Sequence, residues 1–465
     1  MGEGKKYPVQ FYGGYLGAWS CLVLAIAGIM YMLLIRGGGT KSIMVALFVS
    51  LVLGLVLAKD KVGYGDEMLK GLKESMVTTI CMAFFMAGLL SALLKSCGLI
   101  QALLWAVGET HTPISLLPLV AFLVCVVIST ACGTSTGTVT AVSAVMCPIG
   151  AELGINMGLM CGAIISGSIF GDNLAPISDT TIASSQTQGA NLRDVVRSRL
   201  PYSLLAAGIS AVLYVYCGLT MISGSAVQFA NNAQYAKSLV FLAIPVVLIY
   251  LMHKGWGLVS SLLLANAMAV TLCLVLGVIP VAKMFSDKSP IVTGMASMAN
   301  VAIISFLMLM MLQIPVMCGG FDAFAGWLMQ KCSKIRDAEL IAYFASIFGV
   351  VATHSSTNTI LFFGPFVKKL MDGYKEQADG CRSTNILDGV ACGTNGLIPY
   401  GNPMLVITGV CAGLPGVSDT FSFLDIAPYT YHCWGLLLIF LLSILTGVGR
   451  KRSQFAKQVK INMDE

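Results

Sequence analysis

The stretch Gly171-Asp172-Asn173-Leu174-Ala175-Pro176-Ile177-Ser178-Asp179-Thr180-Thr181 places two carboxylates, a proline and several hydroxyl and amide groups within an otherwise apolar chain. Ionisable side chains at membrane depth are costly and typically line the path of a substrate or an ion. Proline and glycine beside them indicate helices that are broken where backbone carbonyl groups can face a cavity. This segment therefore predicts a membrane transporter with discontinuous helices.

The composition of the whole chain agrees with this prediction. Of its 465 residues 57% are hydrophobic and only 11% are charged, whereas a soluble chain carries about a quarter charged residues. Runs long enough to span a bilayer, about 20 residues, cover 16–35, 42–58, 76–94, 201–222, 237–252, 256–280, 291–316 and 426–448, and the regions 113–150, 156–190 and 339–413 are apolar but interrupted. We expect one membrane-embedded domain over 1–465, an all-α polytopic bundle of roughly 10–12 transmembrane helices, and no barrel.

The net charge of +6 does not indicate a nucleic-acid partner. Lys and Arg gather in connectors and at the chain ends, where they indicate how the protein is oriented in the membrane. Basic residues in the N-terminus, the expected 59–75 loop, Arg193/Arg197/Arg199, the 331–336 segment and the tail from Arg450 to Lys460 predict that both termini are cytoplasmic. The fifteen Cys are scattered singly, which indicates buried thiols rather than metal ligands or disulfides. Without a P-loop, a dinucleotide fingerprint or zinc spacing, we expect no enzyme, no cofactor and no ATP-driven pump.

The two halves of the chain carry corresponding interruptions. Ser129–Thr138 in the first half and Ala352–Thr359 in the second are rich in hydroxyl groups, and each precedes an apolar stretch and a proline. Asp172–Asp179 then follows in one half, and Asp388–Pro403 in the other. This arrangement predicts an inverted repeat with cores at 76–190 and 291–413. The alternative is chance, since Ser, Thr and Gly also pack membrane helices closely.

The predicted site depends first on Asp179 and Asp172. Ser178-Asp179-Thr180-Thr181 would cap the start of a new helix. This structural role for Asp179 is compatible with binding a cation. Asp172 lies seven residues earlier, and Pro176 between them would let the two carboxylates face each other across the break. Two close carboxylates cannot both ionise easily, so the pair can exchange protons for a cation.

Neutral oxygen ligands, which hard cations prefer, are expected from the hydroxyl cluster that begins at Thr134, although interhelical packing is its alternative role. His354 is a candidate for proton handling or a satisfied core histidine, and Asn395 and Asn402 indicate an unwound helix or a turn. The predicted cation-, proton- or substrate-binding residues are Thr134, Ser135, Thr138, Asp172, Asn173, Ser178, Asp179, Thr180, His354, Ser355, Asn358, Asp388, Thr394, Asn395 and Asn402, with Asp172 and Asp179 as transient Na⁺ ligands.

With these residues in hand, the chain resembles the NhaC family of Na⁺/H⁺ antiporters. Gly133-Thr134-Ser135-Thr136-Gly137-Thr138 is similar to that family's Gly-Thr-Ser-Trp-Gly-Thr. Phe170–Asn173 and Pro176–Thr181 are similar to its Phe-Gly-Asp-His-x-x-Pro-Ile-Ser-Asp-Thr-Thr. Thr136 replaces the Trp and Asn173 replaces the His.

The resemblance implies a secondary antiporter that exchanges cytoplasmic Na⁺ for H⁺ by alternating access. It also implies a location in the lipid bilayer of the bacterial inner membrane and assembly as a homodimer. The alternative is a Na⁺- or H⁺-coupled carrier of an amino acid or a small carboxylate, because broken-helix N-termini can hold a carboxylate. A channel is disfavoured, since the polar residues cluster at one depth instead of lining a pore.

Overall fold

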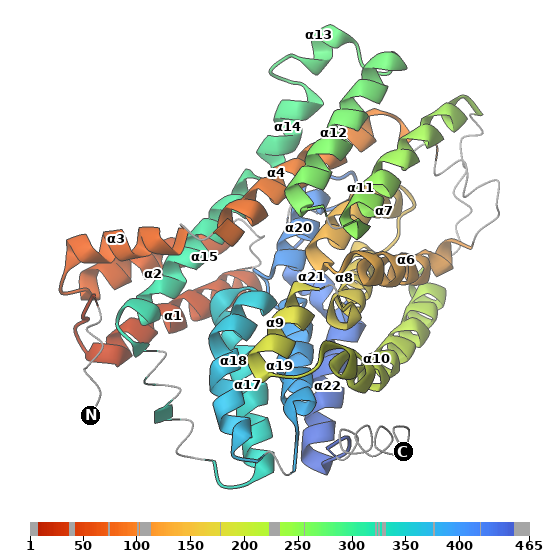
Figure 1. Ribbon diagram of the computed structural model, residues 1–465. Coiled ribbons are helices and arrows are strands. Elements are labelled where there is room, and N and C mark those ends of the chain that lie inside the picture. The colour runs from red at the N-terminus through yellow and green to blue at the C-terminus, as the bar shows by residue number, and fades with distance from the viewer. Residues whose placement is uncertain are drawn as a thin grey trace, which may run out of the picture.

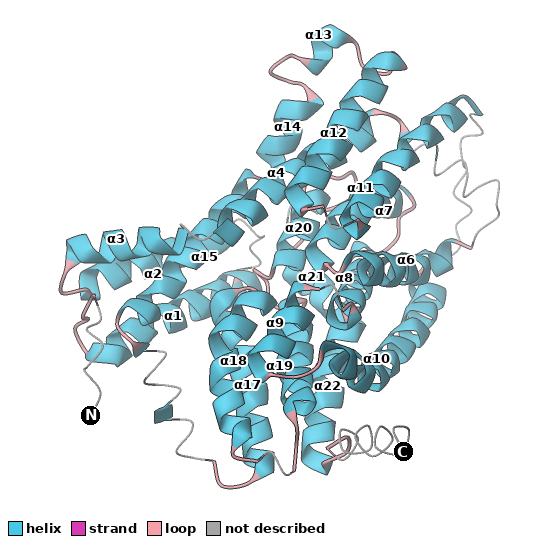
Figure 2. Ribbon diagram, viewed as in Figure 1, coloured by secondary structure: helices cyan, strands magenta, loops and turns pink. Residues whose placement is uncertain are grey.

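A computed structural model describes most of the chain, namely residues 8–36, 42–72, 75–99, 102, 113–176, 178–222, 233–254, 256–320, 323, 326–327, 332–374, 377–418 and 420–450. Over these residues the chain consists of helices and their connections, without a strand (Figure 2). One isolated β-bridge within this part joins Phe11 to Ala58. The prediction of an all-α protein is therefore confirmed.

The helices follow one another in four stretches. The first contains α1 (Gly14–Met30), the π-helical turn η1 (Tyr31–Ile35), α2 (Ile43–Leu57), α3 (Lys61–Leu72) and α4 (Ser75–Ser96). The second contains η3 (Ile114–Leu116), α6 (Leu117–Cys132), α7 (Ser135–Glu152), α8 (Met157–Leu174), α9 (Asp179–Gln188) and α10 (Leu192–Met221). The third contains η4 (Ala233–Leu242), α11 (Ala243–His253), α12 (Leu258–Val275), α13 (Val281–Met284), α14 (Pro290–Ser297) and α15 (Ala299–Met317). The fourth contains α17 (Ile335–Thr353), α18 (Ser356–Asp372), α19 (Gly380–Asn395), α20 (Asn402–Cys411), α21 (Phe423–Ile426), η5 (Ala427–Tyr429) and α22 (Tyr431–Thr446).

Every apolar run expected to span the membrane contains a helix, but two expected connectors are not loops. Most of the 59–75 segment forms α3, which is fixed to α2 because the Tyr64 hydroxyl donates to the Leu51 carbonyl at 2.8 Å. Arg199, counted among the basic loop residues, lies inside α10 and is fully buried. The expectation of a loop was wrong at both places, because charged residues continued a helix instead of ending it.

Among the described residues four helical segments are long and apolar enough to cross a bilayer, at Met157–Leu174, Leu192–Met221, Leu258–Val275 and Pro290–Met317, the last formed by α14 and α15 together. The bent pair Phe423–Tyr429 and Tyr431–Thr446 makes a fifth if it is one span, and shorter apolar helices accompany them in the described part of the chain. Large apolar side chains such as Leu205, Val212 and Leu442 are exposed on these helices, as lipid-facing side chains are. The chain is thus a multi-pass membrane protein; the count of 10–12 crossings stays a prediction.

The predicted interruptions are breaks between helices. α6 ends at Gly133, whose φ of 66° is left-handed, and Thr134 caps the start of α7. α8 and α9 are separated between Leu174 and Asp179, α17 and α18 at His354 and Ser355, and α19 and α20 between Asn395 and Asn402. The prediction of discontinuous helices is therefore confirmed in both halves.

The short helices after two of these breaks pack against the other half of the chain. α9 packs against α18 and α19, and α20 packs against α7. α10 and α22, which come next in each half, pack against each other and also against both α8 and α19. Figure 1 shows α9 beside α18 and α19, with α10 to its right and α22 to its lower right. The breaks of the two halves consequently meet in one interior.

α8 is the central helix of this interior, and every residue from Gly158 to Leu174 is buried. Glycines allow it to lie close to α6: a Cβ on Gly167 would stand 2.3 Å from the Phe122 carbonyl oxygen, and one on Gly171 would stand 2.2 Å from the Thr130 nitrogen. Small residues permit such close approach of helix backbones. The close contact places Asp172, the residue after Gly171, deep inside the protein.

Candidate functional site

Asp172 lies at the C-terminal end of α8 and is buried, with 8% of its surface exposed. Its Oδ2 accepts a hydrogen bond from the Ser135 hydroxyl at 2.7 Å, and its Oδ1 accepts one from the Ser178 hydroxyl at 2.6 Å. Ser135 is the first residue of α7, and Ser178 caps the start of α9. Within the described residues no Lys, Arg or His forms an ion pair with Asp172.

A series of polar side-chain contacts leads from Asp172 into the second half of the protein. The Ser178 hydroxyl lies 3.0 Å from the Thr180 hydroxyl, which lies 3.7 Å from the Cys392 thiol. That thiol lies 3.1 Å from Asp388 Oδ1. This series of polar contacts therefore connects the carboxylate of Asp172 in α8 to the carboxylate of Asp388 in α19.

Asp388 is fully buried and forms an ion pair with Arg199 of α10, with 2.5 Å between Oδ2 and Nη1. The Ser184 hydroxyl also donates to Oδ2, at 3.0 Å. Arg199 donates further to the Asn173 backbone carbonyl and, through Nε, to the Asn385 side chain at 3.1 Å. The pair joins α8, α9, α10 and α19, so Asp388 differs from Asp172 in having a permanent cationic partner.

Asn173 and Thr180 belong to the same interior. The Asn173 Oδ1 accepts from the Ser203 hydroxyl of α10 at 3.0 Å, and its backbone carbonyl accepts from Arg199. Asp179 is placed differently. It opens α9 beside Ser178, but its side chain is exposed. The structure therefore brings Asp172, Asn173, Ser178 and Thr180 together around the break and leaves Asp179 at its edge.

Thr134 and Thr138 serve mainly the local backbone. Thr134 caps α7 by accepting from the Gly137 nitrogen at 3.4 Å, and the Thr138 hydroxyl donates to the Thr134 carbonyl at 2.8 Å. Among the hydroxyl residues predicted in this segment, Ser135 is the one that reaches a carboxylate.

The second half also places polar residues at the breaks between its helices. Ser355 caps α18 by accepting from the Asn358 nitrogen at 3.4 Å. Asn395 ends α19 and Asn402 begins α20, both are buried, and both have an Oδ1 atom without a partner in the described structure. Thr394 donates to the Val390 carbonyl within its helix at 2.7 Å. The unwound segment predicted between Asn395 and Asn402 is confirmed.

His354 occupies a left-handed conformation, with a φ of 49°, between α17 and α18. Its ring is buried, and neither ring nitrogen has a hydrogen-bond partner among the described atoms. A side chain at such a φ costs roughly 1–2 kcal/mol relative to glycine. We expect the free energy of unfolding of His354→Gly to be about 1 kcal/mol higher than that of His354→Ala. Glycine avoids the cost of the left-handed conformation, and its greater flexibility in the unfolded chain offsets part of that gain.

Thermal unfolding of the two variants in detergent tests this difference, since both lose the same ring and differ only in Cβ. Equal stability would show that the break does not hold residue 354 in the left-handed region.

Three groups that the sequence analysis did not predict at the site are built into the interior. Arg199 is the first, and its one sequence signal is an arginine directly before the apolar run at 201–222. The second is Glu339, whose two oxygens accept from Arg382 at 2.9 Å and from Arg450 at 2.9 Å. The third is a set of thiols, Cys147, Cys161 and Cys411, which the structure brings together from three helices. Their spacing along the chain carries no signal of this proximity.

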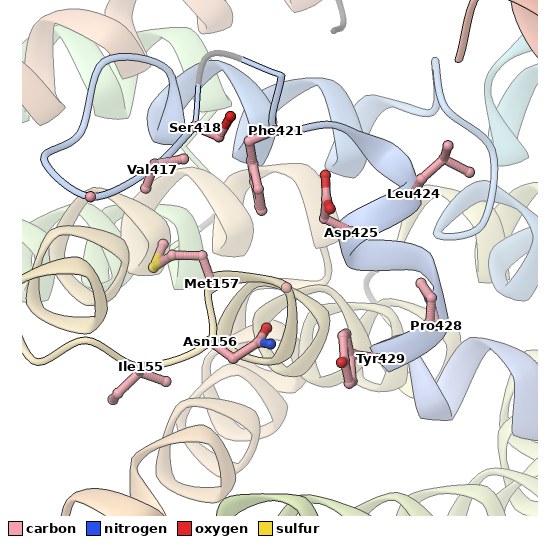
Figure 3. A pocket seen from close by; sticks show the side chains of 12 residues that line it. Ile155, Asn156, Met157, Val417, Ser418, Phe421, Leu424, Asp425, Pro428 and Tyr429 are labelled. Carbon is pink, nitrogen blue, oxygen red and sulfur yellow. The ribbon is translucent and has the colours of Figure 1, made fainter. Parts of the chain in front are cut away.

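A separate cavity of about 470 Å³ lies where the α7–α8 connection meets the segment before α22. Asn156, Asp425 and Tyr429 face it from its opposite walls (Figure 3). Asp425 also accepts a hydrogen bond from the Ser422 nitrogen at 2.8 Å, so its carboxylate caps the N-terminal end of the short helix α21. None of the predicted site residues lines this cavity, which is therefore distinct from the Asp172 interior.

Two curated proteins are similar to parts of the chain. The arginine/ornithine antiporter ArcD of Halobacterium salinarum is 30% identical over 219 residues, which cover 44% of this chain and 45% of that protein. An uncharacterized protein of Haemophilus influenzae is 38% identical over 58 residues, which cover 12% of this chain and 11% of that protein. The matches thus span less than half the length of either relative.

The crystal structure of the Alcanivorax borkumensis YdaH transporter aligns with 94% of this chain and 98% of its own, at 14% identity and a TM-score of 0.37. Residues 11–219 match the sequence profile of the Na⁺/H⁺ antiporter family. That range contains Gly133–Thr138 and Phe170–Thr181, on which the predicted resemblance rests. The resemblance of this chain to the Na⁺/H⁺ antiporter family is thereby confirmed over residues 11–219.

Proposed function

We propose that this protein is a secondary antiporter that exchanges cytoplasmic Na⁺ for H⁺ at Asp172. The observation that carries the proposal is a buried carboxylate at a helix break, hydrogen-bonded by two hydroxyl groups and without an ion-pair partner in the described structure. The family match over residues 11–219, which includes this carboxylate, supports it.

The physical argument starts from the cost of a buried charge. An ionised carboxylate removed from water is strongly unfavourable unless a cation neutralises it. Asp172 is therefore neutral when it carries a proton, and also when it binds a cation. Because the same two oxygens accept either, H⁺ and Na⁺ exclude each other, and alternation between them is exchange.

The surroundings of Asp172 provide the ligands that Na⁺ needs. Hard cations bind oxygen atoms, and the hydroxyls of Ser135 and Ser178 already lie within 2.7 Å of the carboxylate. Both hydroxyls can turn their protons away and offer lone pairs to a bound cation. Thr134, Thr138 and Thr180 would complete the set, and Asn395 would approach from the second half.

Asp388 and Asp179 have supporting roles in this proposal. Asp388 holds Arg199 in place across four helices, which keeps the break beside Asp172 in one geometry. Asp179 is exposed at the edge of the break and attracts cations to the site through its charge. His354 and the unpartnered Asn402 oxygen are available to a substrate or a proton in the second half.

We further propose that the two halves are inverted repeats with cores at 76–190 and 291–413, in which α6–α9 correspond to α17–α20. The support is their common order of breaks and the reciprocal packing of α9 and α20 on the opposite half. Movement of one half against the other would open Asp172 to alternate sides of the membrane. We place the protein in the bacterial cytoplasmic membrane with both termini in the cytoplasm; a homodimer stays a prediction.

A second candidate is an antiporter of amino acids. The similarity to an arginine/ornithine antiporter favours it, and a carboxylate that can neutralise Na⁺ can also neutralise a protonated amine. The two candidates differ in the solute that protons or charge require in order to move: Na⁺ alone for the first, and an amino acid for the second.

Transport in proteoliposomes with an internal pH dye distinguishes them. We expect an external Na⁺ pulse to release protons from vesicles that contain only buffer. If protons move only when an amino acid is supplied, or if arginine exchanges for ornithine without Na⁺, the cation is not the cargo and the second candidate replaces the first.

A further inference from the structure

The thiols of Cys147, Cys161 and Cys411 form a compact group on α7, α8 and α20. The Cys161 sulfur lies 3.9 Å from that of Cys147 and 3.4 Å from that of Cys411, and all three lie within 4.8 Å of one another. Each residue is fully buried, at 0% exposure. This is the one group of three or more His, Cys, Asp or Glu side chains with metal-site geometry in the described part of the chain.

The geometry fits a three-coordinate centre. A thiophilic metal bonds sulfur at about 2.3 Å, so three ligands around one centre stand about 4 Å apart, or less if the centre is pyramidal. The separations of the Cys161 sulfur from those of Cys147 and Cys411 lie in this range, and the remaining pair stands no more than 4.8 Å apart. A linear two-coordinate ion would require about 4.6 Å between two sulfurs, which is more than separates Cys161 from either of the other two, so such an ion would leave Cys161 unused.

The charge of the surroundings decides which centre fits. No Lys or Arg is recorded within bonding distance of the three sulfurs; each thiol has only another member of the group as its partner in the described structure. Three thiolates around a monovalent or divalent ion leave a net negative charge, which is costly to bury. A trivalent centre with three thiolates is neutral and avoids that cost.

We propose that Cys147, Cys161 and Cys411 form a binding site for a trivalent thiophilic metalloid such as arsenic(III). Arsenous acid is neutral and small, and its reaction with the site is a condensation without electron transfer. Three S–H bonds and three As–OH bonds break, three As–S bonds form, and the protons leave with the hydroxyl groups as three water molecules. The product carries no charge, and no oxidant or reductant is needed.

Occupation of this site would fasten the two halves of the protein together. Cys147 and Cys161 belong to the first half, whereas Cys411 ends α20, the helix that the second half packs against α7. The three bonds would fix α20 to α7 and α8 and so stop any motion of one half against the other. This consequence rests on the proposed alternating access, whereas binding of arsenic does not.

Binding is measured on the purified full-length protein in detergent. After incubation with arsenite and desalting, we expect one arsenic per chain by mass spectrometry of the element, and an X-ray absorption spectrum with three As–S bonds. Cys161→Ala and Cys411→Ala should retain less than a tenth of the arsenic at the same concentration. Cys125→Ala, which removes a buried thiol of α6 outside the group, should bind as the wild type does.

Two results would overturn the proposal: no arsenic on the wild-type protein, or equal retention by the wild type and by the Cys161 and Cys411 variants. Transport is a separate measurement. Arsenite should stop exchange in the wild type and in Cys125→Ala, a small dithiol should restore it, and the Cys161 variant should be resistant. Three As–S bonds with unaffected exchange would confirm the site and contradict alternating access between these halves.

Discussion

Asp172→Asn is expected to reduce Na⁺-driven proton release to the level of vesicles without protein. The amide keeps the size of the carboxylate and can still bond the hydroxyls of Ser135 and Ser178, which now donate 2.7 and 2.6 Å hydrogen bonds to it. It can neither carry the exchanged proton nor neutralise Na⁺. The fold should therefore survive while exchange disappears, and initial rates from the internal pH dye measure the loss.

Glu152→Gln is the matched control for this variant. Glu152 is an exposed carboxylate at the end of α7, so the substitution removes the same charge from the same region outside the proposed site. Its exchange rate should stay near that of the wild type. Size-exclusion profiles of both variants verify folding, and a folded Asp172→Asn protein with normal exchange would remove Asp172 from the mechanism.

Asp388→Asn is expected to lower the free energy of unfolding by about 3–5 kcal/mol, because it leaves the Arg199 guanidinium buried without its counter-charge. Both members of the pair are completely inaccessible to solvent. The double variant Arg199→Met with Asp388→Leu should recover much of the loss, since replacing a whole buried pair by apolar side chains is frequently neutral or stabilising. Thermal unfolding in detergent at constant protein concentration gives the comparison.

Thermal unfolding in the presence of Na⁺ distinguishes the roles of Asp172 and Asp388. A ligand that binds the folded protein raises its unfolding temperature, so Na⁺ should raise the midpoint in the wild type and in Asp388→Asn but not in Asp172→Asn. The reverse order would make Asp388 the cation ligand. An Asp388→Asn protein as stable as the wild type would show that the ion pair contributes nothing to the fold.

Much of the architecture could be predicted because the strongest signals are local. Runs of about 20 apolar residues identify membrane helices on length alone, and Pro176 or the Asn395–Asn402 segment indicates a break without knowledge of any neighbour. The capping role of Ser178 was visible for the same reason, and the structure confirms it at 3.3 Å from the Thr180 nitrogen. The 59–75 segment was misjudged because its charges suited a loop as well as the exposed side of α3.

The site was less predictable because its decisive contacts join distant parts of the chain. Asp388 could be recognised as an intramembrane acid, but its pairing with Arg199, 189 residues away, has no local signature. The proximity of Cys161 to Cys411 spans 250 residues and is equally invisible in sequence. Asp172 and Asp179 looked equivalent in the motif, and only the fold shows that one is buried while the other is exposed.

The reciprocal packing of α9 and α20 has a consequence for biogenesis. α9 leaves the ribosome long before α18 and α19, against which it packs, and α7 precedes its partner α20 by some 250 residues. The partners of Asp172 are made with the first half, but Arg199 lacks its counter-charge Asp388 until α19 has been synthesised. Completion of the interior around Arg199 and α9 is thus a late event that requires the second half of the chain.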